Sequence, residues 1–563
     1  MKIFNKKNPL WALYYQHEGF EIDGDKLMGR QAAGNSYLRA LVQSKPETLG
    51  LYLRNNNQKK LAKETISSFL DAGQDIKIQS IAYNNPYESQ NFGGLFLPGP
   101  SLSEFSLGRG IFGHNAYSLI GITHTTASHG VMSSIDSFFT TPVMPWDAVI
   151  CTSQVVADTI KNVTDEKFNQ LKFYLDAKKS ELPMFPIIPL GVHPEDFSYT
   201  DTFKIDSRKE LGINEDDIVV VYVGRLSFHA KAHHLPMYIA LEAASKKLKK
   251  GKIHLIQTGW FANESIESSF KEEAKLVCPS VKFHFLDGKN QDNKHLTLAS
   301  GDIFMSLSDN FQETFGLTPL EGMAAGLPVI VSDWNGYRST VRDGVDGFRI
   351  PSYSMPIGSG EQIAYDHMVG LINYDEYIGF LSQQVAIDID SCIGKLNLLI
   401  DNKDLRLKLG TNGIKSANTK FSWSNIITQY KDLGNELDNL RVSNASKKKL
   451  PTFHLPADRL DPFSIFESYP TFALNENTLV TKNKLSHELS IETIMEFKSV
   501  NFALRSLPPI KLLNQVKNIV EEGEVCSLKE ICDLTQLSDD TINPIIIWLL
   551  KYSFLSLAGD NNE

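Results

Sequence analysis

Short, strongly apolar runs alternate with segments of helical period through most of the chain. Each run is apolar at nearly every position, which is typical of parallel strands buried on both faces. Helix-length segments separate the runs, for example near 234–248. The pattern therefore predicts an α/β protein whose parallel sheets are covered on both sides. The clearest candidate strands are YSLIGIT at 117–123, AVICT at 148–152, IVVVYVG at 218–224, KIHLIQTG at 252–259, VKFHFL at 281–286, DIFMSLS at 302–308 and LPVIVS at 327–332.

This alternation occurs in two blocks, residues 1–195 and 196–425. Two doubly covered sheets in tandem predict two Rossmann-like domains with a cleft between them. Ligands of such sheets bind at the carboxyl ends of the strands. A further helical pattern covers 426–440, and the polar, basic stretch RVSNASKKKLP marks a linker over 441–455.

A smaller unit is predicted over residues 456–563. Its last part reads as a helix from Ile510 to Glu522, a short helix in SLKEICDLT, and a longer helix that ends in an apolar run. This order is that of a winged helix, so a mainly helical, winged-helix-like domain is expected. Because nine acidic and four basic residues lie between Lys511 and Glu563, a module that docks a protein partner is favoured over a DNA-binding one.

Composition narrows the class of protein. At 563 residues the chain is long enough for about three to four domains. Its formal net charge of −10 argues against a general nucleic-acid binder. The five cysteines show no CxxC spacing, which favours a reducing cytoplasm. The N-terminal stretch does not read as a signal peptide, and the sequence contains no run of 18 apolar residues, so membrane contact would be peripheral.

Residues 302–350 carry the richest motif, which includes the sequence FGLTPLEG. Thr318, Pro319 and Glu321 predict a helix start with threonine as the N-cap and Glu321 at N3, and a capping box is one reading of Glu321. The loop before it, Phe315-Gly316-Leu317, would offer free backbone N–H groups to a phosphate. Glu313 lies eight positions before Glu321. A pair of carboxylates that flanks this turn is suited to bind the hydroxyls of a ribose or hexose.

With these motifs in place, the chain resembles the retaining glycosyltransferases of family 4, which have the GT-B fold. The resemblance covers residues ~10 to ~440 and is strongest over 185–350, where PLGVHPEDF at 189–197 and VYVGRLSFHAK at 221–231 also match. It implies that Arg225 and Lys231 bind the diphosphate of the donor. A cationic pair would stabilise the leaving group, while the alternative is two solvated cations in a loop. The family often has glycine after the lysine, whereas this chain has Ala232.

The resemblance also implies roles in the first domain. His124 corresponds to the histidine near the transferred sugar, with His129 as the alternative, although a lone histidine after a strand is more often structural. The family's glycine-rich loop corresponds to GRQAAGNSYLRAL, in which Gly29 and Gly34 would precede a helix. Gly34 is the better match, since its missing side chain would let donor phosphate and acceptor meet at the helix start.

In the family, the first glutamate of the motif contacts the donor sugar and the second the ribose, so these roles fall on Glu313 and Glu321. Thr314, Phe315, Gly316 and Leu317 complete the expected donor-binding loop. The resemblance implies a reaction that retains anomeric configuration. The sequence shows no carboxylate nucleophile for the opposite face, so front-face displacement without a metal ion or other cofactor is expected.

Several other signals are weaker. The glycines of GRGIFG at 108–113 precede a strand-like run rather than a helix, so a dinucleotide site is not favoured. Asp388 and Asp390 could mimic a metal-binding DxD, but they read as a helix N-cap. A phosphate neighbourhood is favoured over a metal site for three histidines near Lys231, namely His229, His233 and His234. Residues 354–387 look like an insertion that shapes either the acceptor side or an oligomer contact.

The sequence thus predicts a cytoplasmic hexosyltransferase that uses a nucleotide diphosphate sugar. The first domain would bind the acceptor, which is left open among a glycan, a lipid-linked saccharide and a polypeptide. The second would bind the donor, and the helix over 426–440 would cross back to the first domain. One alternative is a non-catalytic GT-B subunit that binds a protein partner through its C-terminal domain. Another is a dinucleotide-dependent oxidoreductase, which rests on the glycine motif at 108–113 alone.

Overall fold

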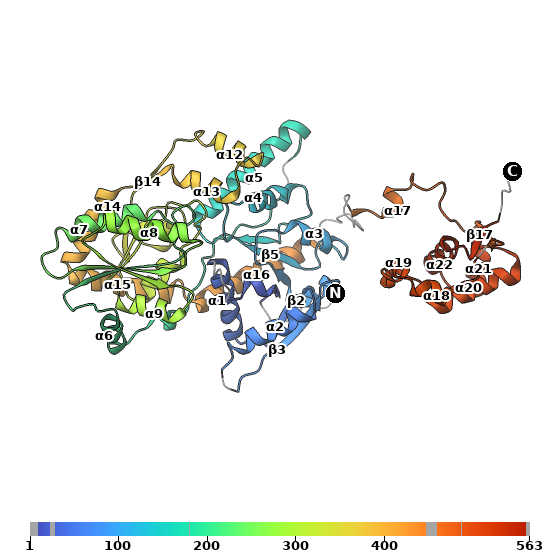
Figure 1. Ribbon diagram of the computed structural model, residues 1–563, viewed down its shortest axis with the longest axis horizontal. Helices are drawn as coiled ribbons and strands as arrows, with labels where there is room; N and C mark the ends of the chain where they lie inside the picture. Colours follow the sequence, from blue (N-terminus) through green and yellow to red (C-terminus); the bar gives the residue numbers. More distant parts are fainter. Residues whose placement is uncertain are drawn as a thin grey trace. The chain divides into compact units, whose positions relative to one another are not determined.

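A computed structural model describes residues 10–22, 29–71, 73–178, 181–445, 459–485 and 487–558. The chain divides into two compact units, Met1–His454 and Leu455–Glu563. Part of the predicted linker, residues 446–455, lies outside the described residues. The first unit contains both Rossmann-like domains, which are coloured blue to teal and green to orange in Figure 1.

The first domain is built on a six-stranded parallel sheet with the order β3-β2-β1-β4-β5-β6. Every residue of β1, β4, β5 and β6 is buried, because helices cover both faces of the sheet. The strands are β1 (Ala12–Tyr14), β2 (Thr48–Leu53), β3 (Lys77–Ala82), β4 (Gly94–Phe96), β5 (Ser118–Ile122) and β6 (Ala148–Ile150). The helices are α1 (Gly29–Gln43), α2 (Asn56–Ser67), α3 (Ser103–Gly110), α4 (His129–Asp136) and α5 (Gln154–Leu175).

A buried ion pair joins α3 to β6 in this domain. The Arg109 guanidinium donates to both carboxylate oxygens of Asp147, at 2.5 and 2.8 Å, and both side chains are completely buried. Asp147 also accepts the backbone N–H of Leu119, so the pair fixes the start of β5 as well. Loss of either partner would leave the other charge buried and unpaired, which is strongly destabilising.

The second domain repeats the architecture with the order β12-β11-β10-β7-β8-β9, again all parallel. Its central strands are fully buried, in agreement with their apolar sequences. The strands are β7 (Ile218–Val223), β8 (Ile253–Gly259), β9 (Lys282–Asp287), β10 (Ile303–Ser306), β11 (Val329–Ser332) and β12 (Gly347–Ile350). The helices are α6 (Asp201–Glu210), α7 (His234–Ser245), α8 (Glu264–Val277), α9 (Gln291–Ser300), α10 (Leu317–Ala324), α11 (Tyr337–Thr340), α14 (Ile389–Asp401) and α15 (Lys403–Thr419). The predicted fold class, two Rossmann-like α/β domains, is confirmed.

Residues 354–387 form a small subdomain on the second domain. It contains α12 (Glu361–Met368) and α13 (Tyr374–Ser382), and an antiparallel pair of β13 (Ser352–Ser354) with β14 (Val385–Ile387) closes its base. The side chain of Asn373 and that of Glu376 form a capping box that fixes the start of α13. The helices therefore lie outside the second sheet on a hairpin-like stem.

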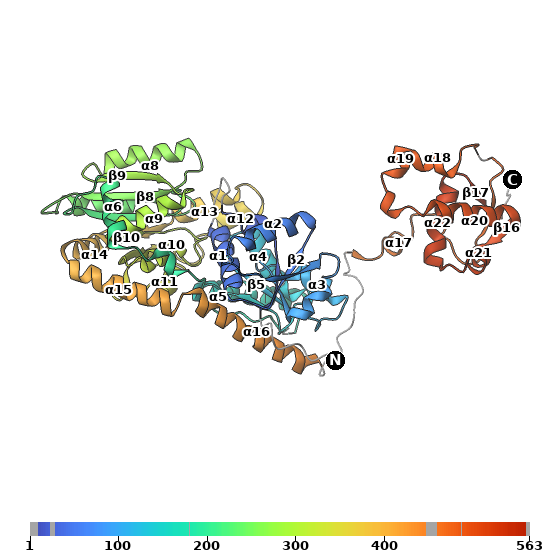
Figure 2. The same ribbon diagram turned by 90° about the horizontal axis from the view of Figure 1, so that it is seen from below.

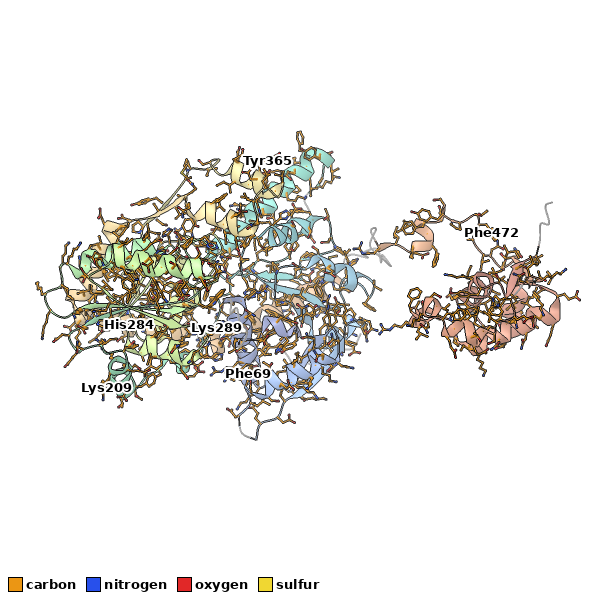
Figure 3. All side chains as sticks on the ribbon, viewed as in Figure 1. Phe69, Lys209, His284, Lys289, Tyr365 and Phe472 are labelled. Atoms are coloured by element: carbon orange, nitrogen blue, oxygen red, sulfur yellow. The ribbon has the colours of Figure 1, made fainter. Side chains whose placement is uncertain are left out.

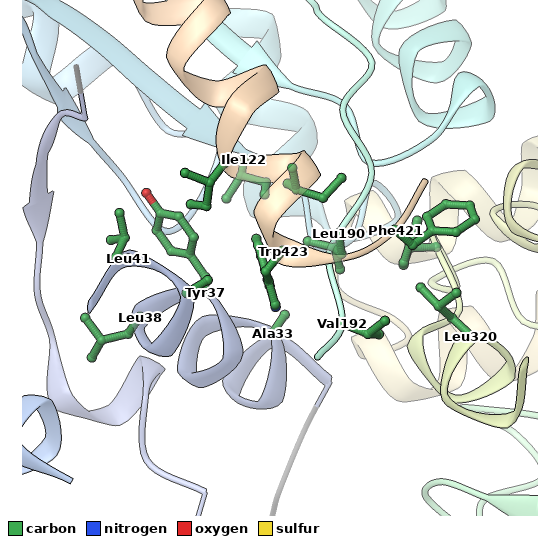
Figure 4. Packing of buried hydrophobic residues seen from close by; sticks show 14 of the residues in the cluster. Ala33, Tyr37, Leu38, Leu41, Ile122, Leu190, Val192, Leu320, Phe421 and Trp423 are labelled. Carbon is green, nitrogen blue, oxygen red and sulfur yellow. The ribbon is translucent and has the colours of Figure 1, made fainter. Parts of the chain in front are cut away.

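A long helix, α16 (Trp423–Ala445), leaves the second domain and runs along the first (Figure 2). Trp423 at its start donates from Nε1 to Ser36 Oγ of α1 at 2.6 Å. Arg441 near its end donates to the Ala116 carbonyl at 3.1 Å. One hydrophobic cluster continues from the first domain through Leu190 and Trp423 to Leu320 of α10, so the two domains share a core (Figure 4).

The second unit is mainly helical, with a three-stranded antiparallel sheet of order β16-β15-β17. It has its own core around Val516, Ile546 and Leu549. Its arrangement contains the helices and short strands that a winged helix would need, but that assignment stays a prediction. The elements are α17 (Pro462–Ile465), β15 (Leu479–Lys482), α18 (Ile491–Glu496), α19 (Lys498–Asn501), α20 (Ile510–Gly523), β16 (Val525–Ser527), α21 (Leu528–Thr535), α22 (Asp539–Lys551) and β17 (Leu555–Leu557).

Among the described residues, no helix has the length and apolar character that a membrane crossing requires.

Candidate active site

An ion pair forms the centre of the candidate site. Lys231, in the loop after β7, donates from Nζ to Oε2 of Glu313, in the loop after β10. The two side chains are only 22% and 11% exposed, so the pair is largely shielded from water. Both loops follow the carboxyl ends of neighbouring strands in the second sheet, where ligands of such sheets bind. The structure therefore brings together Lys231 and Glu313, two of the residues predicted from the sequence.

Arg225 belongs to the same loop as Lys231. The strand ends at Val223, and Gly224 has a φ of +145°, which directs the chain out of the sheet. The Arg225 guanidinium donates to the Ala230 carbonyl at 2.8 Å and lies over the ring of Trp260, 5.9 Å from its centroid. Burial lowers the pKa of Arg225. The loop thus turns back on itself and carries two cations, of which Lys231 pairs with Glu313.

Tyr337 contacts Glu313 and is itself held by Ser306. The Tyr337 hydroxyl lies 2.9 Å from Ser306 Oγ and 3.5 Å from Glu313 Oε2. Burial, followed by the charge of Glu313, raises the pKa of Tyr337 well above its usual value, so its hydroxyl stays protonated as a donor. Tyr337 could not be predicted as a site residue, because it follows Glu313 by 24 positions on another element.

Glu321 forms a second buried pair, with Lys294 of α9. Lys294 Nζ donates to Glu321 Oε1 at 2.6 Å, and the carboxylate is 13% exposed. The other oxygen, Oε2, is buried and has no hydrogen-bond partner, and neither has Oγ1 of Thr318, three residues earlier on α10. Buried polar atoms are normally satisfied. These two atoms therefore keep hydrogen-bonding capacity that no protein group uses.

The predicted capping role of Thr318 is wrong. Helix α10 begins at Leu317, and its N-cap is Gly316, which has a φ of +93° that disfavours any side chain. Glu321 consequently lies in the second turn of α10 and makes no capping bond. The capping-box reading of Glu321 therefore fails, and its side chain is available to the pair with Lys294.

The other residues of the expected donor loop make internal contacts through their side chains. Thr314 Oγ1 donates to the His124 carbonyl at 3.0 Å, and its own carbonyl accepts from Ser153 Oγ at 2.8 Å. Phe315 is 2% exposed and packs in the shared core, and Leu317 packs partly against the same cluster. Any contact of this loop with a ligand would therefore come from its backbone N–H groups.

His124 lies directly across the junction from this loop, at the end of β5. Burial, with the charge of Arg30 acting in the same direction, lowers the pKa of His124 to about 4, so the imidazole is neutral near pH 7. It lines a cavity of about 160 Å³ between α1, the ends of β4 and β5, and α16. His129 lies further along, at the first position of α4.

The predicted position of Gly34 before a helix is wrong. Helix α1 begins at Gly29, so Gly34 lies inside its second turn. A Cβ at Gly34 would lie 2.4 Å from the Gly19 carbonyl oxygen, which explains the glycine by close backbone packing. Gly34 nevertheless lines the same cavity as His124.

The structure also shows where the residues of the weaker sequence signals lie. Gly108 and Gly110 form part of the last turn of α3, and Gly113 follows it before β5, so no helix starts after these glycines. Asp388 is the N-cap of α14 and accepts the Ser391 N–H at 2.9 Å, as predicted. His234 pairs with Glu273, and His233 caps α7. Among the described ranges, no group of three or more His, Cys, Asp or Glu side chains is arranged to hold a metal ion.

Two further residues of the site were missed by sequence reasoning. Asp309 follows β10 and accepts the backbone N–H of His233 at 3.3 Å, and burial raises its pKa to about 7. Gln312 donates from Nε2 to the same Ala230 carbonyl that Arg225 uses. Neither Asp309 nor Gln312 belongs to a motif with a characteristic spacing, so only the fold identifies them as residues of the site.

Comparisons with known proteins match part of the second domain to a family of glycosyl transferases. Residues 203–357 match the family model of glycosyl transferases group 1. A D-inositol 3-phosphate glycosyltransferase of Geodermatophilus obscurus is 28% identical over 213 residues, which is 36% of this chain and 44% of that protein. An uncharacterized glycosyltransferase of Methanocaldococcus jannaschii is 26% identical over 167 residues, 29% of this chain and 39% of the relative. The chain thus spans about two fifths of the length of these curated relatives.

Similar solved structures cover more of the chain at low identity. HepE of Anabaena, in complex with UDP and glucose, has a TM-score of 0.46 and 15% identity over 76% of this chain and 99% of its own. Sucrose-phosphate synthase of Thermosynechococcus elongatus gives the same TM-score, 0.46, and 15% identity, over 76% of this chain and 99% of its own. The part of this chain that carries Arg225, Lys231, Glu313 and Glu321 is therefore similar to the glycosyl transferases of group 1.

Proposed function

We propose that this protein is a glycosyltransferase that moves a hexosyl unit from a nucleoside diphosphate sugar to an acceptor with retention of configuration. The observation that supports it most is the pair of Lys231 and Glu313, with Arg225 in the same loop, at the carboxyl ends of adjacent parallel strands. A cation pair beside a carboxylate matches a ligand that has an anionic and a hydroxyl-bearing part. The family match over residues 203–357 supports the same reading.

The leaving group is the nucleoside diphosphate, and Arg225 and Lys231 would bind it. In the free protein, Lys231 is held by Glu313 and Arg225 by the Ala230 carbonyl, so both cations are oriented before a ligand arrives. Preorganised cations stabilise negative charge that develops as the glycosidic C–O bond breaks. They supply positive charge at the diphosphate, so the proposed reaction needs no metal ion.

The two glutamates would hold hydroxyl groups. Lys231 and Tyr337 both contact Oε2 of Glu313, which leaves Oε1 to accept a hydroxyl of the transferred sugar. The unsatisfied Oε2 of Glu321, with Oγ1 of Thr318 three residues earlier on α10, would accept a ribose hydroxyl. A carboxylate accepts hydroxyl hydrogens well, and each such bond replaces one that the sugar makes with water.

Retention would follow from attack on the face that the diphosphate leaves. The acceptor oxygen forms its bond to the anomeric carbon as the bond to phosphate breaks, and the acceptor proton passes to the departing phosphate oxygen. His124, which is neutral, would donate or accept a hydrogen bond at the sugar without adding charge. The acceptor, a glycan, a lipid-linked saccharide or a polypeptide, would enter from the first domain, and the reaction would take place in the cytoplasm.

A thermal-shift panel of UDP, GDP, ADP and their hexose conjugates tests the proposal. A ligand that binds only the folded protein at 100 times its Kd adds about 2.7 kcal/mol of stability, so at least one nucleotide should raise the melting temperature. Glu321→Gln should reduce that shift, because a neutral amide accepts ribose hydroxyls less well. Glu264→Gln on the exposed start of α8 is the matched control. A panel without any shift would contradict the proposal.

A further inference from the structure

The insertion, residues 354–387, touches both sides of the junction between the two domains. On the side of the first domain, the ring centroid of His367 on α12 lies 6.2 Å from that of His129. Tyr374 on α13 also forms a hydrogen bond with the side chain of Thr125. On the side of the second domain, Gly379 of α13 lies against His229. In Figure 3, Tyr365 marks the outer part of the insertion. The insertion therefore reaches the loop that carries Arg225.

Tyr374 is connected to Arg225 through two hydrogen bonds and one shared acceptor. Its hydroxyl donates to Gln312 Oε1 at 3.4 Å, and Gln312 Nε2 donates to the Ala230 carbonyl. Arg225 donates to that same carbonyl at 2.8 Å. Gln312 is also the residue before Glu313. The side chain of Tyr374 therefore helps to hold Gln312, which is linked to Arg225 through the Ala230 carbonyl and to Glu313 along the backbone.

Asp375, the next residue, places a negative charge close to the same cations. Asp375 lies four residues before Gly379 on α13, on the face of the helix that Gly379 places against His229. Burial lowers the pKa of Arg225 and of His229, and the negative charge of Asp375 acts against that effect in both cases. Asp375 is exposed in the first turn of α13, and the insertion contains no lysine or arginine that would neutralise it. The Asp375 carboxylate would therefore repel a diphosphate that binds to the guanidinium of Arg225.

We propose that the insertion tunes the affinity of the diphosphate site through two adjacent residues with opposite effects. Tyr374 is a positioning residue that orients Gln312 and, through the Ala230 carbonyl, Arg225. Asp375 is a counter-charge that weakens the hold on the anionic product and so favours its release. The inference rests on the proposed function, since it requires that Arg225 binds the diphosphate of the donor.

Two conservative variants separate these roles. Tyr374→Phe removes one hydrogen bond and should weaken diphosphate binding about fivefold. Asp375→Asn removes a negative charge that repels the diphosphate. It should strengthen diphosphate binding about two- to fivefold, the range for a charge pair near the surface. The matched controls lie on α12: Tyr365→Phe and Glu361→Gln, both exposed, should leave affinity unchanged.

The experiment titrates UDP, GDP and ADP separately into the full chain by calorimetry, with circular dichroism as a check of folding. Opposite shifts for Asp375→Asn and Tyr374→Phe, with unchanged controls, support the inference. A shift in the same direction for both, or none in either, overturns it, since an insertion that only scaffolds the domain would act through its fold alone. If the wild type binds none of the nucleotides, or Arg225→Ala binds them equally well, the proposed function itself fails and the inference with it.

Discussion

Gly316, in the loop of the candidate site, leaves no room for a side chain. Its φ of +93° lies where residues other than glycine are strained. A Cβ there would lie 2.4 Å from Cδ1 and Cε1 of Tyr337. Tyr337 is fully buried, and its hydroxyl is tied to Ser306 and close to Glu313. The ring therefore has little freedom to move aside.

The cost of Gly316→Ala can be divided into two contributions. The backbone strain is about 1 kcal/mol, and forcing a methyl into a filled core adds about 1–3 kcal/mol. Gly344 provides the control, because it has a φ of +70° but no atom within 4 Å of its Cβ position. Gly344→Ala should cost about 1 kcal/mol from backbone strain alone. We therefore expect Gly316→Ala to be the more destabilising variant by about 1–3 kcal/mol.

Urea unfolding followed by tryptophan fluorescence measures this difference. Of the six tryptophans, only Trp548 lies in the second unit, so the signal reports mainly on the first. The midpoint should fall further for Gly316→Ala than for Gly344→Ala, with an unchanged slope. Displacement of Tyr337 should also reduce nucleotide affinity in Gly316→Ala alone. Equal stability losses in the two variants would refute the claim that Tyr337 fills the space beside Gly316.

Three other predictions concern buried charges. Lys294→Met leaves Glu321 without its cation and should cost about 1–3 kcal/mol in urea unfolding, whereas Lys294→Arg should retain most of the stability. Because burial lowers the pKa of His124 to about 4, the unfolded chain binds its proton first as pH drops through about 6.5. Stability is therefore lost between pH 6.5 and 5.5 by about 1 kcal/mol, and His124→Gln should lessen the loss over that interval by the same amount. Asp147→Asn should cost about 3–5 kcal/mol, seen as lower soluble yield and an earlier urea midpoint, because Arg109 then stays buried without its counter-ion; wild-type stability would contradict this.

The strands of the second domain could be predicted well, because parallel strands buried on both faces are apolar along their whole length. The run 218–224 corresponds to β7 (Ile218–Val223) and 252–259 to β8 (Ile253–Gly259). Short strands carry less signal: β1 has three residues, and its burial is decided by neighbours far away in the sequence.

Two errors at helix starts share a physical cause. At α10 the N-cap is a glycine with positive φ, which a pattern of capping side chains does not reveal. At α1 the helix begins before Gly34, and that glycine is explained by the carbonyl of Gly19, which a reading of the helix itself does not include. Both positions are determined by contacts rather than by local propensity.

In the candidate site, too, some residues could be predicted from the sequence and others could not. Arg225, Lys231, Glu313 and Glu321 could be named from the sequence because they belong to motifs that resemble those of a known family. The residues that contact the site from other elements could not be named, because they meet it only in the folded chain: Lys294 at Glu321, Tyr337 at Glu313 and Tyr374 at Gln312. Sequence reasoning thus found the charged groups of these motifs but missed the side chains that orient and neutralise them.

Turnover of the donor is the most direct test of the proposed function. Purified full-length protein would be incubated with UDP-, GDP- and ADP-hexoses, and release of the nucleoside diphosphate would be followed over time. We expect release from at least one donor, and a fall of about 100-fold or more in both Arg225→Ala and Glu313→Gln, since each removes a group that stabilises the transition state. Arg338→Ala, an exposed arginine of the same domain, is the control. Wild-type rates in both Arg225→Ala and Glu313→Gln would contradict the account.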